Sequence, residues 1–531
     1  MCDVLVGLAE AQHFRDDDSA AAKVSLKRAK DLRERVGLAE RLYIEASMQQ
    51  EEAREREGKA GDKEKAAAAD KGGTEGTAAR AAREAKEFKE FKESTATGTL
   101  RKLVAMRPEE VEAKVFLAES LMDGFNGDGT PKAGTAAGQA VLREVLAGHP
   151  EDSAANHYWI HAVEPGNHPE WALESARKLG AMVPASGHMV HMPGHIFYRT
   201  GDYKRARASF ERSMAVEEAY MREQQVGVDH DWNYVHNLMY LIADLLEEGR
   251  VAEATSVSAK LNAARGETAA TLYRFSTRDG LTRLDVALPV VLRGGEWVRA
   301  AAMLERSKPD AGSRTMVWVR GALLEYVRGM AALEAGDVAG AARHRDGLDA
   351  AMKVEPAGGG RGAGMKGMGG HPMPSMAGAG SKDMEMEPVR SFMEVAAREL
   401  RGSVLMAGGK RAEAEAAFEN AVEAEAALGY HEPPNYIRPV AETRGDALMR
   451  AGRYGEAKAA YAMALKERPN SGYALYGMAR AAAGAGDEAG ASAAFGKMLA
   501  AWEGADAGLP QVVAARAWVA AHGGVRAGGG Q

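Results

Sequence analysis

Apolar residues recur along most of the chain at the spacing of amphipathic helices. Residues 3–50 indicate two or three such helices, of which residues 39–46 (Ala-Glu-Arg-Leu-Tyr-Ile-Glu-Ala) are the clearest. From residue 51 to about residue 92 large apolar residues almost disappear, and Ala, Glu, Lys, Arg and Gly dominate. Helical patterning then resumes and continues to about residue 522. The pattern predicts an all-α protein.

A 34-residue interval separates equivalent residues in two distant regions of the chain, which is a strong sign of an internal repeat. Within each repeat, one helix ends at a turn such as Gly201-Asp202-Tyr203, and a second helix with small residues follows. A single hairpin of this size cannot bury its own apolar face, so the hairpins are expected to stack. The pairs at this interval are Pro150 and Pro184, Ala172 and Ala206, Ala176 and Phe210, Gly452 and Gly486, and Ala457 and Ala491.

This pattern resembles the tetratricopeptide repeat. Weaker units centre on Gly249, Gly295, Gly336 and Gly409, and the resemblance covers roughly residues 100–520. It implies a solenoid of helical hairpins in which the first helix of every pair lines a concave groove that binds ligands. The small and aromatic positions of the repeat are occupied here by Gly194, Phe197, Gly201, Tyr203, Ala206 and Phe210.

Composition shifts divide the chain into segments, with two arrays of repeats as the main halves. The stretch between them holds ten glycines and six methionines, and indicates a linker or long loop. The predicted segments are 1–50 (N-terminal helices or a truncated repeat), 51–98 (charged low-complexity insert), 99–355 (array with a histidine-rich groove), 356–388 (Gly/Met-rich linker), 389–522 (C-terminal array) and 523–531 (disordered tail).

Charge and cysteine content narrow the function classes. The net charge of −7 over 531 residues argues against a nucleic-acid partner, which would require a basic face. No stretch reaches the roughly 18 consecutive apolar residues of a membrane span. Cys2 is the single cysteine, and the first residues lack a signal peptide, so the sequence as written predicts a cytoplasmic protein.

Histidines follow the repeat. His157 and His161 lie four apart on one predicted inner helix, and His191 and His195 occupy the equivalent positions 34 residues later. Residues four apart share a helix face, and Glu164 extends the first stripe. His188 and His236 are equivalent to each other, since each lies 13 residues before a turn glycine. The predicted groove residues are His157, His161, Glu164, His188, His191, His195, His236 and Asn237.

Two functions remain open for this groove. The first is a scaffold that binds a peptide, a protein or a small ligand. The second is a metalloprotein that uses His157, His161, His191 and His195 to hold a divalent transition metal such as zinc, copper or iron, because imidazole and carboxylate suit these ions. No His-Glu-x-x-His motif is present, so the sequence favours a binding protein over an enzyme and predicts no catalytic residue.

Three further features of the sequence each allow two interpretations. Pro193 either lies inside a helix that starts near Gly187 or occupies the first turn of one that starts at Met192. The methionines of the linker are either soft ligands for Cu(I) or part of an unstructured segment. Residues 430–436 (Tyr-His-Glu-Pro-Pro-Asn-Tyr), in a connection nine residues longer than the period, form either a lid over the groove or a surface loop.

A closer resemblance concerns a bacterial subfamily of tetratricopeptide proteins of unassigned function. It rests on residues 157–164 and 187–196, on the His236-Asn237 pair and on residues 432–434. Members of that subfamily have a further repeat and a paired-cysteine segment near the start, and many look exported. The resemblance therefore implies that an upstream repeat, a second cysteine and a signal peptide precede Met1, in which case the protein is exported.

Overall fold

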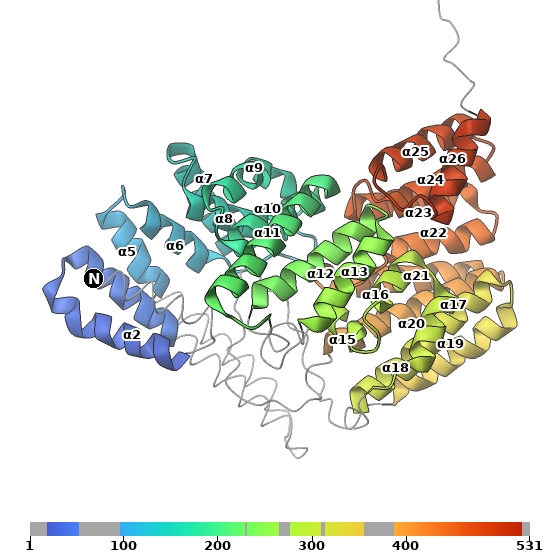
Figure 1. The fold of residues 1–531 in the computed structure, drawn as a ribbon, viewed down its shortest axis with the longest axis horizontal. Helices are drawn as coiled ribbons and strands as arrows, with labels where there is room; N and C mark the ends of the chain where they lie inside the picture. The colour runs from blue at the N-terminus through green and yellow to red at the C-terminus, as the bar shows by residue number, and fades with distance from the viewer. Residues whose placement is uncertain are drawn as a thin grey trace, which may run out of the picture. The chain divides into compact units, whose positions relative to one another are not determined.

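The computed structural model describes residues 19–52, 96–228, 231–264, 277–309, 314–354 and 387–522 (Figure 1). These residues are mostly helical, and no strand occurs among them apart from one isolated bridge between Phe125 and Pro131. The predicted all-α class with stacked helical hairpins is confirmed. None of the described helices is both long and apolar enough to cross a bilayer.

The chain forms two compact units that divide between His168 and Pro169. In the N-terminal unit, residues 38–52 are helical and include the segment predicted most clearly from the sequence. Its apolar core joins this helix, through Ala46, to Leu100 and Leu103 of the following hairpin. The other elements are α2 (Ser19–Leu32), η1 (Arg33–Arg35), α5 (Gly98–Met106), α6 (Val111–Leu121), α7 (Ala133–Gly148) and α8 (Ser153–Val163).

The main unit begins at Pro169 and contains the larger array of hairpins. Successive helices pack against one another along the chain. Its elements are η3 (Pro169–Ala172), α9 (Leu173–Met182), α10 (Gly187–Arg199), α11 (Tyr203–Gln224), α12 (Trp232–Glu247), α13 (Val251–Ala263), α15 (Thr277–Thr282), α16 (Leu288–Gly294), α17 (Trp297–Arg306), α18 (Arg314–Glu334), α19 (Val338–Lys353), α20 (Glu387–Ala407), α21 (Arg411–Ala427), α22 (Val440–Arg450), α23 (Tyr454–Glu467), α24 (Gly472–Gly484), α25 (Glu488–Ala501) and α26 (Pro510–His522).

A glycine in the left-handed conformation terminates the first helix of seven hairpins in the main unit. Their φ angles lie between 69° and 77°, a region that costs other residues energy. Each of these glycines is the turn residue of a repeat predicted from the sequence, which confirms the placement of those turns. They are Gly201, Gly249, Gly295, Gly336, Gly409, Gly452 and Gly486.

The core of the main unit runs continuously past the segment predicted as a linker. Helices α18 and α19, before residue 355, pack on α20, after residue 386, and one apolar cluster extends from Leu281 to Ala481. Hairpins distant in sequence also meet within this unit. The indole N–H of Trp502 donates to the carbonyl of Glu247 at 2.6 Å, and the backbone N–H of Asp506 donates to that of Gly249 at 3.1 Å.

Several sequence predictions lie outside the described residues. The charged insert, the Gly/Met-rich linker with its methionines, and the C-terminal tail fall largely or wholly on residues 53–95, 355–386 and 523–531. The predicted segment boundaries therefore stay predictions.

Candidate metal centre

Helices α10 and α12 are the first helices of consecutive hairpins and carry most of the predicted groove residues. Helix α10 begins after Ser186, whose hydroxyl accepts a hydrogen bond from the N–H of Met189 at 3.4 Å. Helix α12 begins after Asp231, whose carboxylate accepts from the N–H of Tyr234 at 2.9 Å. These caps satisfy N–H groups that have no partner inside the helix. They define where each helix starts, and so which face carries the histidines.

Helices α10 and α11 pack closely beneath the histidines. A Cβ added at Gly194 would lie 2.3 Å from the ring of Phe210, so the backbone of α10 rests directly on this ring.

Pro193 lies inside α10. Of the two positions considered for this proline, the structure therefore has the one inside a helix that starts at Gly187. Pro193 cannot donate a hydrogen bond to the carbonyl of Met189 one turn earlier.

Three histidines meet between α10 and α12. His191 and His195, one turn apart on α10, have no exposed surface, and His236 on α12 is 5% exposed. Each offers a ring nitrogen that lies within 4.8 Å of those of the other two. The Nε2 atoms of His191 and His195 are 2.5 Å apart. We call these three residues the histidine cluster.

Aromatic rings from α11 and α12 pack against the histidine cluster. The ring centroid of Tyr240, one turn beyond His236 on α12, lies 4.3 Å from that of His195 and 5.7 Å from that of His191. Phe210 of α11 packs against His191 with centroids 5.0 Å apart. These rings and the burial of the histidines shield the cluster from solvent, which strengthens any electrostatic interaction inside it.

Asn237 fixes the tautomer of His191. Its side-chain N–H donates to the carbonyl of Phe210 at 2.8 Å, and a carbonyl can only accept. The Asn237 oxygen, 2.7 Å from Nδ1 of His191, must then accept the Nδ1 proton. Nε2 of neutral His191 is left with its lone pair, directed at His195.

Burial favours the neutral form of the His191 ring. Burial lowers its pKa well below 6.5, and the neighbouring rings of His195 and His236 lower it further. The hydrogen bond to Asn237 opposes these effects and is outweighed. A neutral imidazole is the form that can accept a proton or bind a metal ion.

The segment between α21 and α22 brings a carboxylate to the histidine cluster. One oxygen of Glu432, Oε2, lies 3.7 Å from Nδ1 of His195 and 3.7 Å from Nε2 of His236. The Glu432 side chain is 13% exposed. Of the two alternatives for residues 430–436, the structure favours a segment that lies over the groove residues of the main unit.

A second chain of contacts supports His188 near the start of α10. The side-chain oxygen of Asn233 lies 3.3 Å from Nδ1 of His188, and the Asn233 N–H donates to Glu217 at 2.7 Å. Burial and the nearby Asp231 raise the pKa of Glu217 to about 8. Residues 233 and 237, one turn apart on α12, therefore each orient one histidine of α10.

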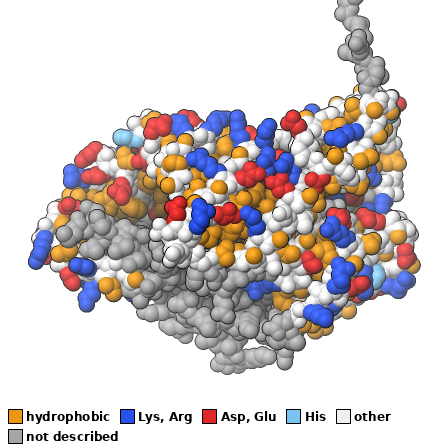
Figure 2. All heavy atoms as spheres, viewed as in Figure 1, with side chains coloured by type: hydrophobic (Ala, Val, Ile, Leu, Met, Phe, Trp, Pro, Cys, Tyr) orange, Lys and Arg blue, Asp and Glu red, His pale blue; other side chains and the backbone are white. Residues whose placement is uncertain are grey.

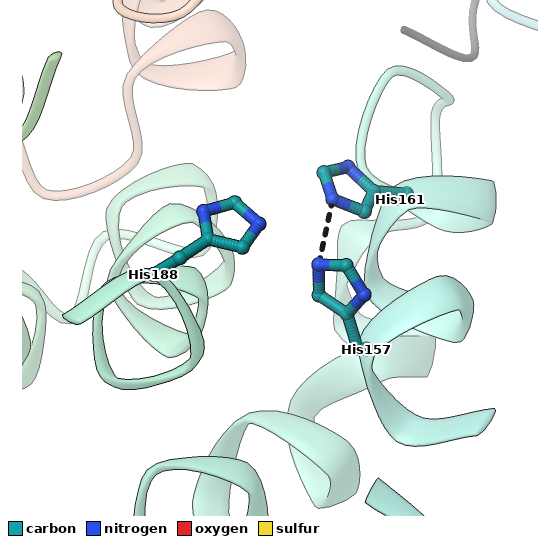
Figure 3. A group of neighbouring side chains, drawn as sticks. All are labelled: His157, His161 and His188. Atoms are coloured by element: carbon teal, nitrogen blue, oxygen red, sulfur yellow. Dashed lines mark hydrogen bonds between the residues drawn. The ribbon is translucent and has the colours of Figure 1, made fainter. Parts of the chain in front are cut away.

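In the N-terminal unit, α8 carries the equivalent pair. Its first residue precedes that of α10 by 34 positions, as the repeat predicts. Nε2 of His157 lies 3.1 Å from Nε2 of His161, the contact dashed in Figure 3. Glu164 caps the C-terminus of α8 and is fully buried. His188, also drawn in Figure 3, belongs to α10 of the main unit, so a single groove lined by all the predicted residues involves both units and stays a prediction.

The sequence identified the histidines but missed two partners in the main unit. Glu432 stands in a connection nine residues longer than the period, and that insertion is the signal that could have assigned it to the site. The Tyr240 ring carried no such signal, because an aromatic residue on a helix face is usually core.

Comparison with known proteins adds no assignment. No family model and no curated protein sequence matches the chain. Yeast Tom70 is 13% identical with a TM-score of 0.27, and the match covers 98% of this chain and 95% of that chain. The human IFIT1 dimer with m7Gppp-AAAA is 12% identical with a TM-score of 0.35, covering 95% and 91%. The TPR domain of P58(IPK) is 14% identical with a TM-score of 0.20, covering 78% and 99%. At these values the likeness carries no argument about function.

Proposed function

We propose that this chain is a helical-repeat scaffold whose main unit binds one divalent transition-metal ion at the histidine cluster, His191, His195 and His236. The repeat architecture supports a protein-binding role, as stacked hairpins generally provide extended binding surfaces. The observation that supports the metal ion is the convergence of three buried ring nitrogens within 4.8 Å of one another.

The burial of the histidine cluster distinguishes a metal site from a peptide-binding site. A peptide lying in a groove could touch these rings only through exposed surface, and His191 and His195 have none. These buried imidazoles therefore fit an ion better than they fit a peptide side chain.

The donor types narrow the choice of ion. Imidazole nitrogen with a carboxylate oxygen nearby suits zinc, copper or iron, whereas magnesium and calcium prefer oxygen ligands alone. The position of an aromatic shell behind the rings also matches the dry surroundings in which such ions are held. Zinc is the ion we would test first, since it needs only three or four nitrogen and oxygen ligands.

Metal content tests this proposal. Full-length protein purified without a histidine tag and incubated with Zn²⁺ should retain about one ion per chain after desalting, measured by inductively coupled plasma mass spectrometry. The His195→Ala variant should retain less than about a tenth of that amount. A site with so few ligands loses most of its affinity for the ion when one ligand is removed. His344→Gln is the matched control, because His344 of α19 pairs with Glu325 of α18 and neither belongs to the histidine cluster. Wild-type protein that retains no zinc would contradict the proposal.

The same proposal includes a protein or peptide partner that binds the helical-repeat scaffold. Figure 2 shows basic and acidic side chains interspersed over the described part of one face, in keeping with the small net charge. A partner for such a face would be a protein surface of mixed charge. The absence of a nucleic-acid partner stays a prediction from the sequence.

A further inference from the structure

Two carboxyl groups meet beside the start of α10 and the start of α12. Glu217 of α11 is 8% exposed, and Asp231, the residue before α12, is 7% exposed. The charged group that acts on Glu217 is Asp231, and no basic side chain pairs with Glu217 among the described residues. Two buried carboxyl groups in contact do not both ionise readily, because each charge loses its water and repels the other.

We propose that Glu217 and Asp231 share one proton at neutral pH and act as a proton-dependent latch that holds the start of α10 on α11 and α12. Loss of this proton as the pH rises opens the latch. The site belongs to the main unit alone, and the inference does not depend on the proposed metal ion.

The hydrogen bonds leave one place for the shared proton. Oε1 of Glu217 accepts from the side-chain N–H of Asn233 at 2.7 Å. Oδ1 of Asp231 accepts from the backbone N–H of Tyr234 at 2.9 Å. Oδ2 of Asp231 is buried, and no amide, hydroxyl or basic group in the described part of the chain donates to it. Buried polar atoms are nearly always hydrogen-bonded, and a neutral Glu217 that donates to Asp231 satisfies this oxygen.

The surroundings favour the neutral form of Glu217. Burial, followed by the hydrogen bond and the charge of Asp231, raises the pKa of Glu217 to about 8. The hydrogen bond from Asn233 acts in the opposite direction and is outweighed. A carboxyl group with this pKa is mostly protonated at neutral pH.

The other titratable groups beside the pair have partners of their own. Glu218, the next residue on α11, accepts from the hydroxyl of Tyr234 at 3.0 Å and from Lys260 of α13 at 2.8 Å. On α10, Nδ1 of His188 lies 3.3 Å from the side-chain oxygen of Asn233. The cation on α13 is therefore held by a different carboxylate, and the pair keeps its own proton.

The latch reaches the first turn of α10. A Cβ added at Gly187 would lie 1.7 Å from Oε1 of Glu217, so the carboxyl group rests on the backbone of this turn. Ser213, one turn earlier on α11, donates to the carbonyl of Gly187 at 2.9 Å. Asn233, which donates to Glu217, also contacts the ring of His188. Ionisation of both carboxyl groups would drive them apart, and so loosen this turn or the cap of α12.

The dependence of stability on pH tests for the shared proton. Folding raises the pKa of Glu217 from 4.5 to about 8, so the folded state holds a proton that the unfolded state releases. Stability is then lost as the pH rises through this range. Glu217→Gln keeps a neutral group that can donate to Asp231 and accept from Asn233 at every pH. In urea denaturation with EDTA present, the unfolding constant of wild type relative to Glu217→Gln should rise about tenfold for each pH unit between roughly pH 5.5 and 7.5.

Two further variants identify the partner and the background. In an Asp231→Asn background, Glu217→Gln should change the pH dependence much less, because the charge of Asp231 no longer raises the pKa of Glu217. Glu223→Gln, at an exposed site on the same helix, is the matched control and should not change the pH dependence. Circular dichroism at about pH 6 checks that each variant folds. A ratio of wild type to Glu217→Gln that is constant with pH overturns the shared proton. An equal pH dependence with and without Asp231 overturns the pair.

Hydrogen–deuterium exchange with mass spectrometry tests the latch. Peptides that contain residues 187–192 should exchange several-fold faster in wild type than in Glu217→Gln at about pH 9, and equally at about pH 6. Because the two proteins are compared at the same pH, the intrinsic effect of pH on exchange cancels. Equal exchange at both pH values overturns the latch, even if denaturation shows the shared proton.

Discussion

At the scale of single residues, the candidate site depends on close contacts beneath α10. Gly194 lets the helix backbone rest on Phe210, and Phe210 in turn packs against His191. A larger residue at position 194 would have to push α10 away from α11. The His191 ring, held from α12 by Asn237, would then lose its place between the two helices.

Gly194→Ala should therefore destabilise the main unit by about 1–3 kcal/mol, the usual range for forcing extra volume into a packed core. In most helix interiors the same change stabilises by roughly 0.5–1 kcal/mol. Gly496→Ala on α25 is the matched control, since nothing lies within 4 Å of its added Cβ. Urea denaturation of both variants measures the difference. An equal or greater stability of Gly194→Ala would contradict the close packing.

The sequence could predict residue types and their phase but not the roles of single atoms. His191 and His195 were identified because they repeat the positions of another pair at the 34-residue interval. Which nitrogen of His191 carries a proton depends on Phe210 and Asn237, which are brought together only by the packing of three helices. Hydrogen-bond polarity of this kind leaves no mark on the sequence pattern.

At the scale of helices, a buried network of charges joins α12, α16 and α22 to the turn between α23 and α24 in the main unit. Arg293 of α16 donates to Glu247 of α12 at 2.7 Å and to Glu442 of α22 at 2.8 Å. Arg468, just after α23, donates to Glu247 at 3.0 Å. Ser471, the cap residue of α24, donates to the same carboxylate at 2.6 Å. These groups are almost fully buried, so removing one partner would leave another charge uncompensated.

Glu247 should make the stability of the main unit depend on acid pH. Burial alone would raise its pKa, but Arg293 and Arg468 outweigh burial and hold the pKa at about 2, against 4.5 in the unfolded chain. A carboxyl group whose pKa is lowered by folding stabilises the protein above its unfolded pKa, and this stabilisation is lost as the pH falls towards the folded value. The contribution is about 3 kcal/mol above pH 4.5.

We expect the difference in unfolding free energy between wild type and Glu247→Gln to be large at pH 6 and to shrink by about 2 kcal/mol at pH 3. Urea denaturation at the two pH values measures it. Glu296→Gln, whose carboxylate pairs with Arg299 at an exposed site, is the control and should change little at either pH. A constant difference for Glu247→Gln would argue against the lowered pKa.

Helix pairs and their turns were the most predictable part of the fold. The seven turn glycines were visible as repeat centres because a left-handed turn favours glycine wherever a hairpin closes in this way. The segment between α21 and α22 was left open between a lid and a loop. Its composition indicated a connection longer than the repeat period, but only the position of α10 determines what Glu432 approaches.

At the scale of the whole molecule, contacts within the main unit connect hairpins that the repeat period does not relate. Trp502 and Asp506 reach the turn at Gly249, and Asn470 donates to the carbonyl of Gly201 at 3.1 Å. A repeat period describes how each hairpin packs on the next. It contains no information on which distant hairpins meet. The division between His168 and Pro169 was equally hidden, since the repeat continues across it.

X-ray absorption spectroscopy of the zinc-loaded, tag-free protein tests the central claim most directly. It predicts nitrogen and oxygen ligands at about 2.0–2.2 Å, no sulfur ligand, and the outer-shell scattering of imidazole. His195→Ala should lose the bound zinc or show weaker imidazole scattering from the zinc that remains, and His344→Gln should change neither. A zinc spectrum without imidazole scattering, or one that is identical in His195→Ala, would contradict a metal centre at the histidine cluster.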